Sequence, residues 1–108
     1  MHEDFVTFTS EKGEKHPCDI QVYALSTFGF CKGALEFLRN NKIAFRFVYV
    51  DLLEPDKRIK IKKDLTEMLV KFDEHLGFPC VMIDGGKNFV VGFTEEKYKD
   101  AFMKEKKK

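Results

Sequence analysis

The feature that most constrains the fold is a helical stripe lying between two short apolar segments, residues 20–25 and 44–50. Both segments are rich in β-branched and aromatic residues, which favour strands. Between them, apolar side chains recur at the i, i+3, i+4, i+7 spacing of an amphipathic helix: Cys31, Ala34, Leu35 and Leu38. A strand reached through one crossover helix runs parallel to the strand before it. The pattern therefore predicts a βαβ unit, in which Ser26 or Thr27 caps the helix and the asparagines at 40–41 end it.

The second half of the chain carries a longer helical stripe, a hairpin and a short final helix. The long stripe begins at Pro55, which a first helical turn tolerates, and is expected to stop at Gly77. Its members are Ile61, Leu65, Met68, Leu69, Phe72 and Leu76. Asp-Gly and Gly-Gly steps within residues 84–87 supply the positive φ of a tight hairpin between two strands. Thr94 is expected to cap the last helix. The predicted inner face of that helix consists of Tyr98, Ala101 and Phe102.

In chain order these segments predict an α/β fold, β-α-β-α-β-β-α, with a mixed four-stranded sheet and helices on both of its faces. Residues 20–103 would form this domain. Residues 1–19 would form an N-terminal extension, in which the weak alternation of residues 5–8 predicts an edge strand. Residues 104–108 would form a basic tail.

Length and charge exclude several broad classes of protein. With 108 residues, 44% of them hydrophobic and 14% aromatic, the chain fits one compact domain with a single core. A formal net charge of +1 gives no large attraction to nucleic acid or anionic lipid. No apolar run approaches the roughly 20 residues of a membrane span, and the chain begins with acidic residues where a signal peptide would be basic. We therefore expect a soluble, cytoplasmic monomer without nucleic-acid or membrane partners.

The three cysteines, Cys18, Cys31 and Cys80, are an odd number without even spacing. This argues against the disulfide framework of a small secreted protein. Together with His16 and His75 they also lack the paired spacing of structural zinc sites, so we expect no metal site. Any role of the cysteines is therefore chemical or incidental.

The segments most informative about chemistry are the turn before the first helix and the approach to the hairpin. The first, residues 25–34, is Leu-Ser-Thr-Phe-Gly-Phe-Cys-Lys-Gly-Ala, and the second, residues 77–80, is Gly-Phe-Pro-Cys. With the Val-Gly-Phe-Thr-Glu-Glu of residues 91–96, they resemble the active-site turn, the cis-proline and the glycine turn of glutaredoxins. The resemblance spans residues 20–102 and is strongest to small archaeal and bacterial members. It implies the thioredoxin fold, a cis bond before Pro79, and thiol-disulfide exchange with glutathione as co-substrate.

The chain departs from that family at the position of the nucleophile. The resemblance aligns Phe28 with the first cysteine of the Cys-x-x-Cys turn and Cys31 with the second. In the family the first cysteine is the nucleophile, because a helix N-terminus favours thiolate. On its helical stripe Cys31 should face the core, where burial raises the pKa of a thiol. The missing first thiolate also disfavours the iron-sulfur cluster of monothiol glutaredoxins, so we expect no bound cofactor.

The resemblance also assigns a glutathione site residue by residue. The backbone of Phe78, before Pro79, would pair with the cysteinyl part of glutathione. The amides of Thr94 and Glu95 would bind its γ-glutamyl carboxylate. Leu25 stands where glutaredoxins often carry a basic residue, which removes one carboxylate contact unless Lys32 or Lys12 compensates for it.

Sequence alone leaves the roles of the altered residues open. Phe28 is either a hydrophobic cap over a lost site or an apolar contact for a substrate or partner. Cys31 is either a small buried core residue or a residual redox thiol. A disulfide between Cys31 and Cys80 would replace the missing partner, but neighbouring strand residues point to opposite faces and the two sulfurs would then diverge. Cys18, in the loop before the first strand of the domain, is either an adventitious thiol or a distant resolving one.

Two functions agree with these observations. The first is a glutaredoxin-like thiol-disulfide oxidoreductase that acts through Cys31 on glutathione or on protein thiols and disulfides. The second is a non-catalytic thioredoxin-fold module that binds glutathione, or a thiol or peptide partner, in the groove beside Pro79. Because function resides in the site and the site is the altered part, the fold cannot choose between them.

Overall fold

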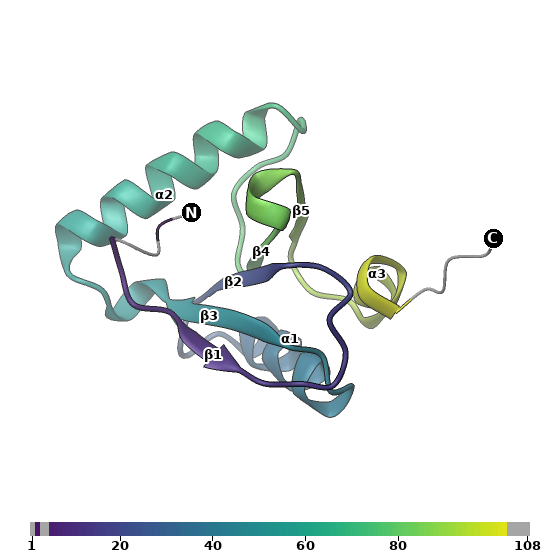
Figure 1. Ribbon diagram of the computed structural model, residues 1–108. Coiled ribbons are helices and arrows are strands. Elements are labelled where there is room, and N and C mark those ends of the chain that lie inside the picture. Colours follow the sequence, from purple (N-terminus) through teal and green to yellow (C-terminus); the bar gives the residue numbers. More distant parts are fainter. Residues whose placement is uncertain (1, 3–4, 104–108) are drawn as a thin grey trace.

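The computed structural model describes residues 2 and 5–103. These residues form one mixed five-stranded sheet, and Figure 1 shows the helices that pack on it. The strands are β1 (Thr9–Glu11), β2 (Ile20–Ala24), β3 (Phe45–Tyr49), β4 (Cys80–Ile83) and β5 (Asn88–Val91). The helices are α1 (Gly29–Asn40), α2 (Pro55–Val70) and α3 (Glu95–Tyr98). Turns of 3-10 type occupy Val50–Leu52 and Asp84–Gly86, and a π-helical turn, Lys99–Met103, continues α3. The predicted α/β thioredoxin fold is confirmed.

The sheet has the order β1-β3-β2-β4-β5. β2 and β3 are parallel, as the predicted βαβ unit requires, with Ala24 opposite Tyr49 at their carboxyl ends. β4 runs antiparallel to β2, with Tyr23 opposite Cys80, and β5 runs antiparallel to β4. The carboxyl ends of β2 and β3 and the amino end of β4 therefore meet at one end of the sheet, from which α1 starts. We call it the turn end.

Two separate hydrophobic clusters lie on the two faces of the sheet, because successive strand residues point to opposite faces. Figure 1 shows α1 and α2 on opposite sides of the sheet. The cluster beneath α1 and α3 includes Val22, Ala24, Cys31, Leu35, Leu38 and Tyr98. The cluster beneath α2 includes Tyr23, Val48, Ile61, Leu65, Leu69 and Cys80. Burying each large apolar side chain contributes about 1.5–3 kcal/mol, so these clusters hold the helices on the sheet.

The hairpin and the start of the last helix form as their sequences predict. Asp84, Gly85 and Gly86 have φ values of 52°, 70° and 108°, in the left-handed region that Asp-Gly and Gly-Gly steps favour. Thr94 caps α3, since its side-chain oxygen accepts a hydrogen bond of 3.1 Å from the amide of Lys97.

The N-terminal edge strand lies later in the chain than predicted. The strand is Thr9–Glu11, paired antiparallel with β3, and not residues 5–8. Residues 5–8 cover the α2 face of the sheet instead: Val6 is buried in the cluster there, and the ring of Phe8 meets Tyr23 edge-on at 5.6 Å. The apolar side chains of residues 5–8 are therefore buried against the sheet and do not form a strand. With β1 the sheet has five strands, one more than the predicted four.

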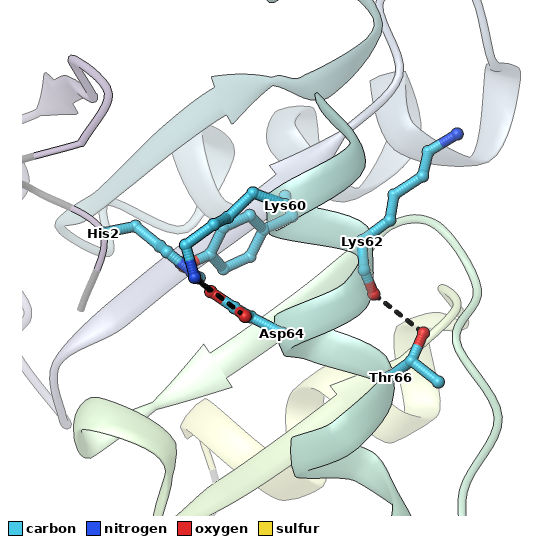
Figure 2. A network of polar contacts seen from close by, with 6 residues as sticks. His2, Lys60, Lys62, Asp64 and Thr66 are labelled. Atoms are coloured by element: carbon cyan, nitrogen blue, oxygen red, sulfur yellow. Dashed lines mark hydrogen bonds and ion pairs between the residues drawn. The ribbon is translucent and has the colours of Figure 1, made fainter. Parts of the chain in front are cut away.

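His2 fastens this N-terminal segment to β2 and α2. Its Nε2 lies 3.0 Å from a carboxylate oxygen of Asp64, and its Nδ1 lies 2.8 Å from the hydroxyl of Tyr23. Figure 2 shows the same carboxylate paired with Lys60, at 3.0 Å. The hydrogen bond to His2, and then the bond to Lys60, hold the pKa of Asp64 below its usual value.

Two helices differ from their predictions near the carboxyl end. α2 ends at Val70 and does not continue to Gly77, because the chain enters the left-handed region at Asp73, where φ is 58°. Phe72 of the predicted stripe therefore lies beyond the helix and is exposed. Ala101, predicted on the inner face of the last helix, is also exposed, because the π-helical turn there changes the angular spacing of side chains.

The predicted basic tail, residues 104–108, lies outside the described residues. Within residues 2 and 5–103, no helix has the length and apolar character needed to cross a membrane. The division of the chain into an extension, residues 1–19, and a domain, residues 20–103, stays a prediction.

Candidate functional site

α1 begins at the turn end of the sheet, shortly after β2. Its N-cap residue is Phe28, whose carbonyl accepts hydrogen bonds from the amides of Cys31 and Lys32 at 3.0 and 3.1 Å. The prediction that Ser26 or Thr27 caps the helix is wrong, because the hydroxyl of Ser26 bonds to another loop. A phenyl ring accepts no such bond, and the first turn of α1 holds no acidic residue, so the start of this helix has no side-chain cap.

The partner of Ser26 is Asp51, which follows β3. Ser26 donates its amide to one carboxylate oxygen of Asp51 at 2.9 Å and its hydroxyl to the other at 2.6 Å. Arg58, on the first turns of α2, donates to the carbonyls of Asp51 and Leu53 at 3.4 and 3.3 Å. Desolvation acts to raise the pKa of Asp51, but the hydrogen bonds from Ser26 and the charge of Arg58 outweigh it and hold that pKa below its usual value.

Two aromatic rings extend from this turn into solvent. Phe28 is 40% exposed and Phe30 is 59% exposed, and their rings meet edge-on with centroids 5.4 Å apart. At the N-cap of α1, where the resemblance aligns a reactive cysteine, the chain thus presents an apolar surface.

Cys31 is fully buried beneath the turn. Its sulfur packs in the cluster under α1 and accepts a hydrogen bond of 3.2 Å from the amide of Leu25. Desolvation raises the pKa of this thiol; the Leu25 bond acts to lower it, and the negative charge of Asp51 acts to raise it. The predicted burial of Cys31 is confirmed, and both burial and pKa oppose its action as a nucleophile.

The other two thiols are also poor nucleophiles. Cys80 is fully buried, and desolvation followed by the charge of Glu74 raises its pKa to about 12. Cys18 is partly buried, and desolvation, with the charges of Asp84 and Asp19, raises its pKa to about 11. All three cysteines are free. Cys31 and Cys80 belong to clusters on opposite faces of the sheet, so the structure does not bring them together as a disulfide pair.

The bond between Phe78 and Pro79 is cis, which confirms the prediction. Phe78 immediately precedes Pro79 at the amino end of β4, and its side chain packs against both hydrophobic clusters. Cys80, the first residue of β4, pairs with Tyr23 next to the carboxyl end of β2. Phe78 and Pro79 therefore lie at the turn end, together with Phe28 and Cys31.

The loop before α3 reaches the same end of the sheet. The amide of Gly92 donates to the carbonyl of Pro79 at 2.8 Å, and the hydroxyl of Tyr98 donates to the carbonyl of Gly92 at 3.1 Å. Thr94 and Glu95, which follow this loop, are exposed. The amides of Thr94 and Glu95 are the predicted carboxylate-binding groups. The loop that precedes them therefore lies next to the cis-proline, Pro79.

The contact between Ser26 and Asp51 is the feature of the site that the sequence analysis missed. An acidic residue directly after the apolar segment 44–50 was a usable signal, because a carboxylate leaving a buried strand needs hydrogen-bond donors. Among residues 2 and 5–103, no group of three or more His, Cys, Asp or Glu side chains could hold a metal ion.

Comparisons with known proteins agree with this geometry. The family model described as Glutaredoxin matches residues 20–87. The glutaredoxin of Methanosarcina mazei Go1 is 26% identical with a TM-score of 0.69, covering 87% of this chain and 85% of that one. Methanoredoxin of Methanosarcina acetivorans is 26% identical with a TM-score of 0.70, covering 84% and 90%. A glutaredoxin of Archaeoglobus fulgidus is 29% identical with a TM-score of 0.64, covering 77% and 84%. No curated protein matches the sequence significantly.

Proposed function

The chain belongs to the glutaredoxin family, and from this premise we propose that its turn binds a thiol-containing partner with little thiol-disulfide exchange of its own. By family it is a glutaredoxin-like redox protein. The observation that supports the proposal is the state of its three cysteines, because exchange requires an accessible thiolate. Cys31 and Cys80 are fully buried, and a pKa of about 11 at Cys18 leaves about one thiolate in ten thousand at pH 7.

In this proposal Phe28 takes the place of the family's first cysteine. The amides at the start of α1, which would stabilise a thiolate there, have no thiol beside them. The exposed ring of Phe28, together with that of Phe30, would instead contact an apolar part of the partner.

The partner would bind beside Pro79. The backbone of Phe78 would pair with the cysteinyl residue of glutathione or of an extended peptide, and the amides of Thr94 and Glu95 would bind a carboxylate. The cis bond at Pro79 and the neighbouring loop before Thr94 support this placement. Leu25 would leave one carboxylate of glutathione without a cation, so its binding would be weaker than in a glutaredoxin that has a basic residue there. The monomeric state and the cytoplasmic location belong to this proposal as predictions.

A second candidate function is thiol-disulfide exchange through Cys31. It is favoured by one observation, the hydrogen bond from the amide of Leu25 to the sulfur, since a bond to the sulfur stabilises thiolate. This function requires the turn to open, because the sulfur is fully buried. The rate at which Cys31 reacts with a chromogenic disulfide at neutral pH separates the two candidates, since only the second predicts fast reaction.

The proposed function is tested by placing a thiol at the start of α1. Phe28→Cys should gain glutathione-dependent disulfide reductase activity of at least about tenfold over the parent, a barrier difference of ~1.4 kcal/mol. Phe30→Cys is the matched control, because it adds an exposed thiol to the same turn away from the N-cap. Equal activity of the parent and both variants would show that Phe28 does not occupy the nucleophile position. A titration with glutathione, followed by amide shifts of Phe78, Thr94 and Glu95, tests the binding site itself.

A further inference from the structure

The carboxylate of Asp51, which follows β3, is hydrogen-bonded to Ser26 in the loop that follows β2. Asp51 accepts both the amide and the hydroxyl of Ser26, at 2.9 and 2.6 Å. Two charge-assisted hydrogen bonds to one residue fix its orientation as well as its distance. Since Ser26 lies two residues before the N-cap of α1, this contact fixes the path of the turn into the helix.

Two residues of this turn, one before Ser26 and one after it, form hydrogen bonds with Cys31. Leu25, before it, donates its amide to the sulfur at 3.2 Å, and Phe28, after it, accepts the amide of Cys31 at 3.0 Å. While Ser26 keeps its position, the hydrogen bonds of Leu25 and Phe28 with Cys31 are therefore kept as well. The same turn carries the exposed ring of Phe28.

We infer that Asp51 is the positioning residue of this site: by holding Ser26 it keeps residues 25–28 folded over Cys31 and closes that thiol to partners. The inference deepens the proposed function, on which it rests for the identity of the site, by naming what controls access to it. Asp51 touches no reacting atom and acts through Ser26.

Two further observations support this role. Arg58 donates to the carbonyls of Asp51 and Leu53, so the loop that carries Asp51 is itself held by the first turns of α2. The negative charge of Asp51 also disfavours a thiolate at Cys31 and contributes to its raised pKa, after desolvation. The closed turn therefore shields Cys31 from reagents and keeps its thiol desolvated, and the charge of Asp51 adds a separate contribution to the raised pKa.

The experiment measures alkylation of Cys31 by iodoacetamide across the alkaline range, with Cys80 mapped in the same samples. Cys80 is fully buried in the cluster on the opposite face, so its rate reports global opening. The test variants are Asp51→Asn, which removes the charge, and Ser26→Ala, which keeps it. Asp19→Asn is the matched control, because Asp19 also accepts two hydrogen bonds, from Arg46 at 2.7 and 2.9 Å, far from the turn.

Asp51→Asn should raise the rate at Cys31 relative to Cys80 by at least about tenfold and lower the pH midpoint of its reaction. Ser26→Ala should also raise the relative rate, but it should lower the midpoint less than Asp51→Asn does, because it keeps the charge of Asp51. Asp51→Glu restores the charge and should return the midpoint to the parent value. Asp19→Asn should change neither quantity.

The inference is overturned if Asp51→Asn and Asp19→Asn behave alike at Cys31. It is also overturned if the rates at Cys31 and Cys80 rise together, because the change would then be a loss of global stability. A parent in which Cys31 already reacts fast would contradict the proposed function. A slow parent that Asp51→Asn leaves slow would contradict only the positioning role.

Discussion

The helices α1 and α3 begin at neighbouring loops, but only α3 has a side-chain cap and acidic residues in its first turn. α3 has a threonine cap, Thr94, whose oxygen accepts the amide of Lys97, and two glutamates in its first turn. α1 begins at Phe28 with no side-chain cap and no acidic residue in its first turn. A cap and first-turn acids stabilise a helix start, so α3 is built for stability. Departures from such rules concentrate at functional sites, which agrees with the proposed binding site at the start of α1.

The largest change in unfolding free energy should come from disturbing the contact between α1 and the loop before α3. A Cβ added at Gly33 of α1 would lie 3.0 Å from the ring of Phe93, in the loop before α3. Gly33→Ala should therefore displace that ring and be about 1–3 kcal/mol less stable than Gly29→Ala, measured by urea denaturation. Gly29→Ala is the matched control on the same helix, since nothing lies within 4 Å of its added Cβ. If both variants are equally stable, α1 and the loop do not pack as described.

An intermediate effect should come from the caps. Thr94→Ala should lose about 1 kcal/mol of unfolding free energy, because the amide of Lys97 loses its acceptor.

At Phe28 two variants, Phe28→Ser and Phe28→Ala, both remove the ring. The serine variant should be about 1 kcal/mol more stable than the alanine variant, because serine supplies the missing cap. Equal stability of the two Phe28 variants would show that the start of α1 does not lack a cap.

The smallest effect should be a change in how the unfolding free energy depends on pH in the acid range, caused by replacing Asp51. The pKa of Asp51 is below its ordinary value of 3.8 in the folded chain, so its contribution to stability is fully present above that value. The contribution is lost as pH falls through the lowered folded pKa. Asp51→Asn should therefore flatten the acid decline in unfolding free energy, followed by urea denaturation at successive pH values. An unchanged slope would mean that the bonds from Ser26 do not stabilise the charged carboxylate.

Local patterns predicted most of the fold. The apolar stripe through Cys31 and Leu38 predicted a parallel βαβ unit, and the turn at residues 84–87 predicted the hairpin. The end of α2 was missed, because the stripe of side chains continues past Val70 while the backbone changes direction at Asp73. The edge strand was misplaced, because residues 5–8 have apolar side chains that suit burial on a face as well as strand pairing.

The site was predicted in part. The burial of Cys31 and the cis bond at Pro79 were predicted correctly, the first from helical periodicity and the second from the family resemblance and the turn it requires. The contact of Ser26 with Asp51 was not predicted, because it joins residues 25 positions apart and depends on the parallel pairing of β2 and β3. Local sequence predicts Ser26 or Thr27 as a helix cap instead, because it does not show the distant carboxylate that Ser26 binds.

The measurement that tests the central claim most directly is the reaction of the native protein's thiols with iodoacetamide at neutral pH, mapped by mass spectrometry. The claim is that Cys31, fully buried beneath the turn, is no working nucleophile. The account predicts that the partly buried Cys18 is alkylated first, and that Cys31 reacts no faster than Cys80. Alkylation of Cys31 ahead of both would contradict the account and make this chain a working monothiol enzyme.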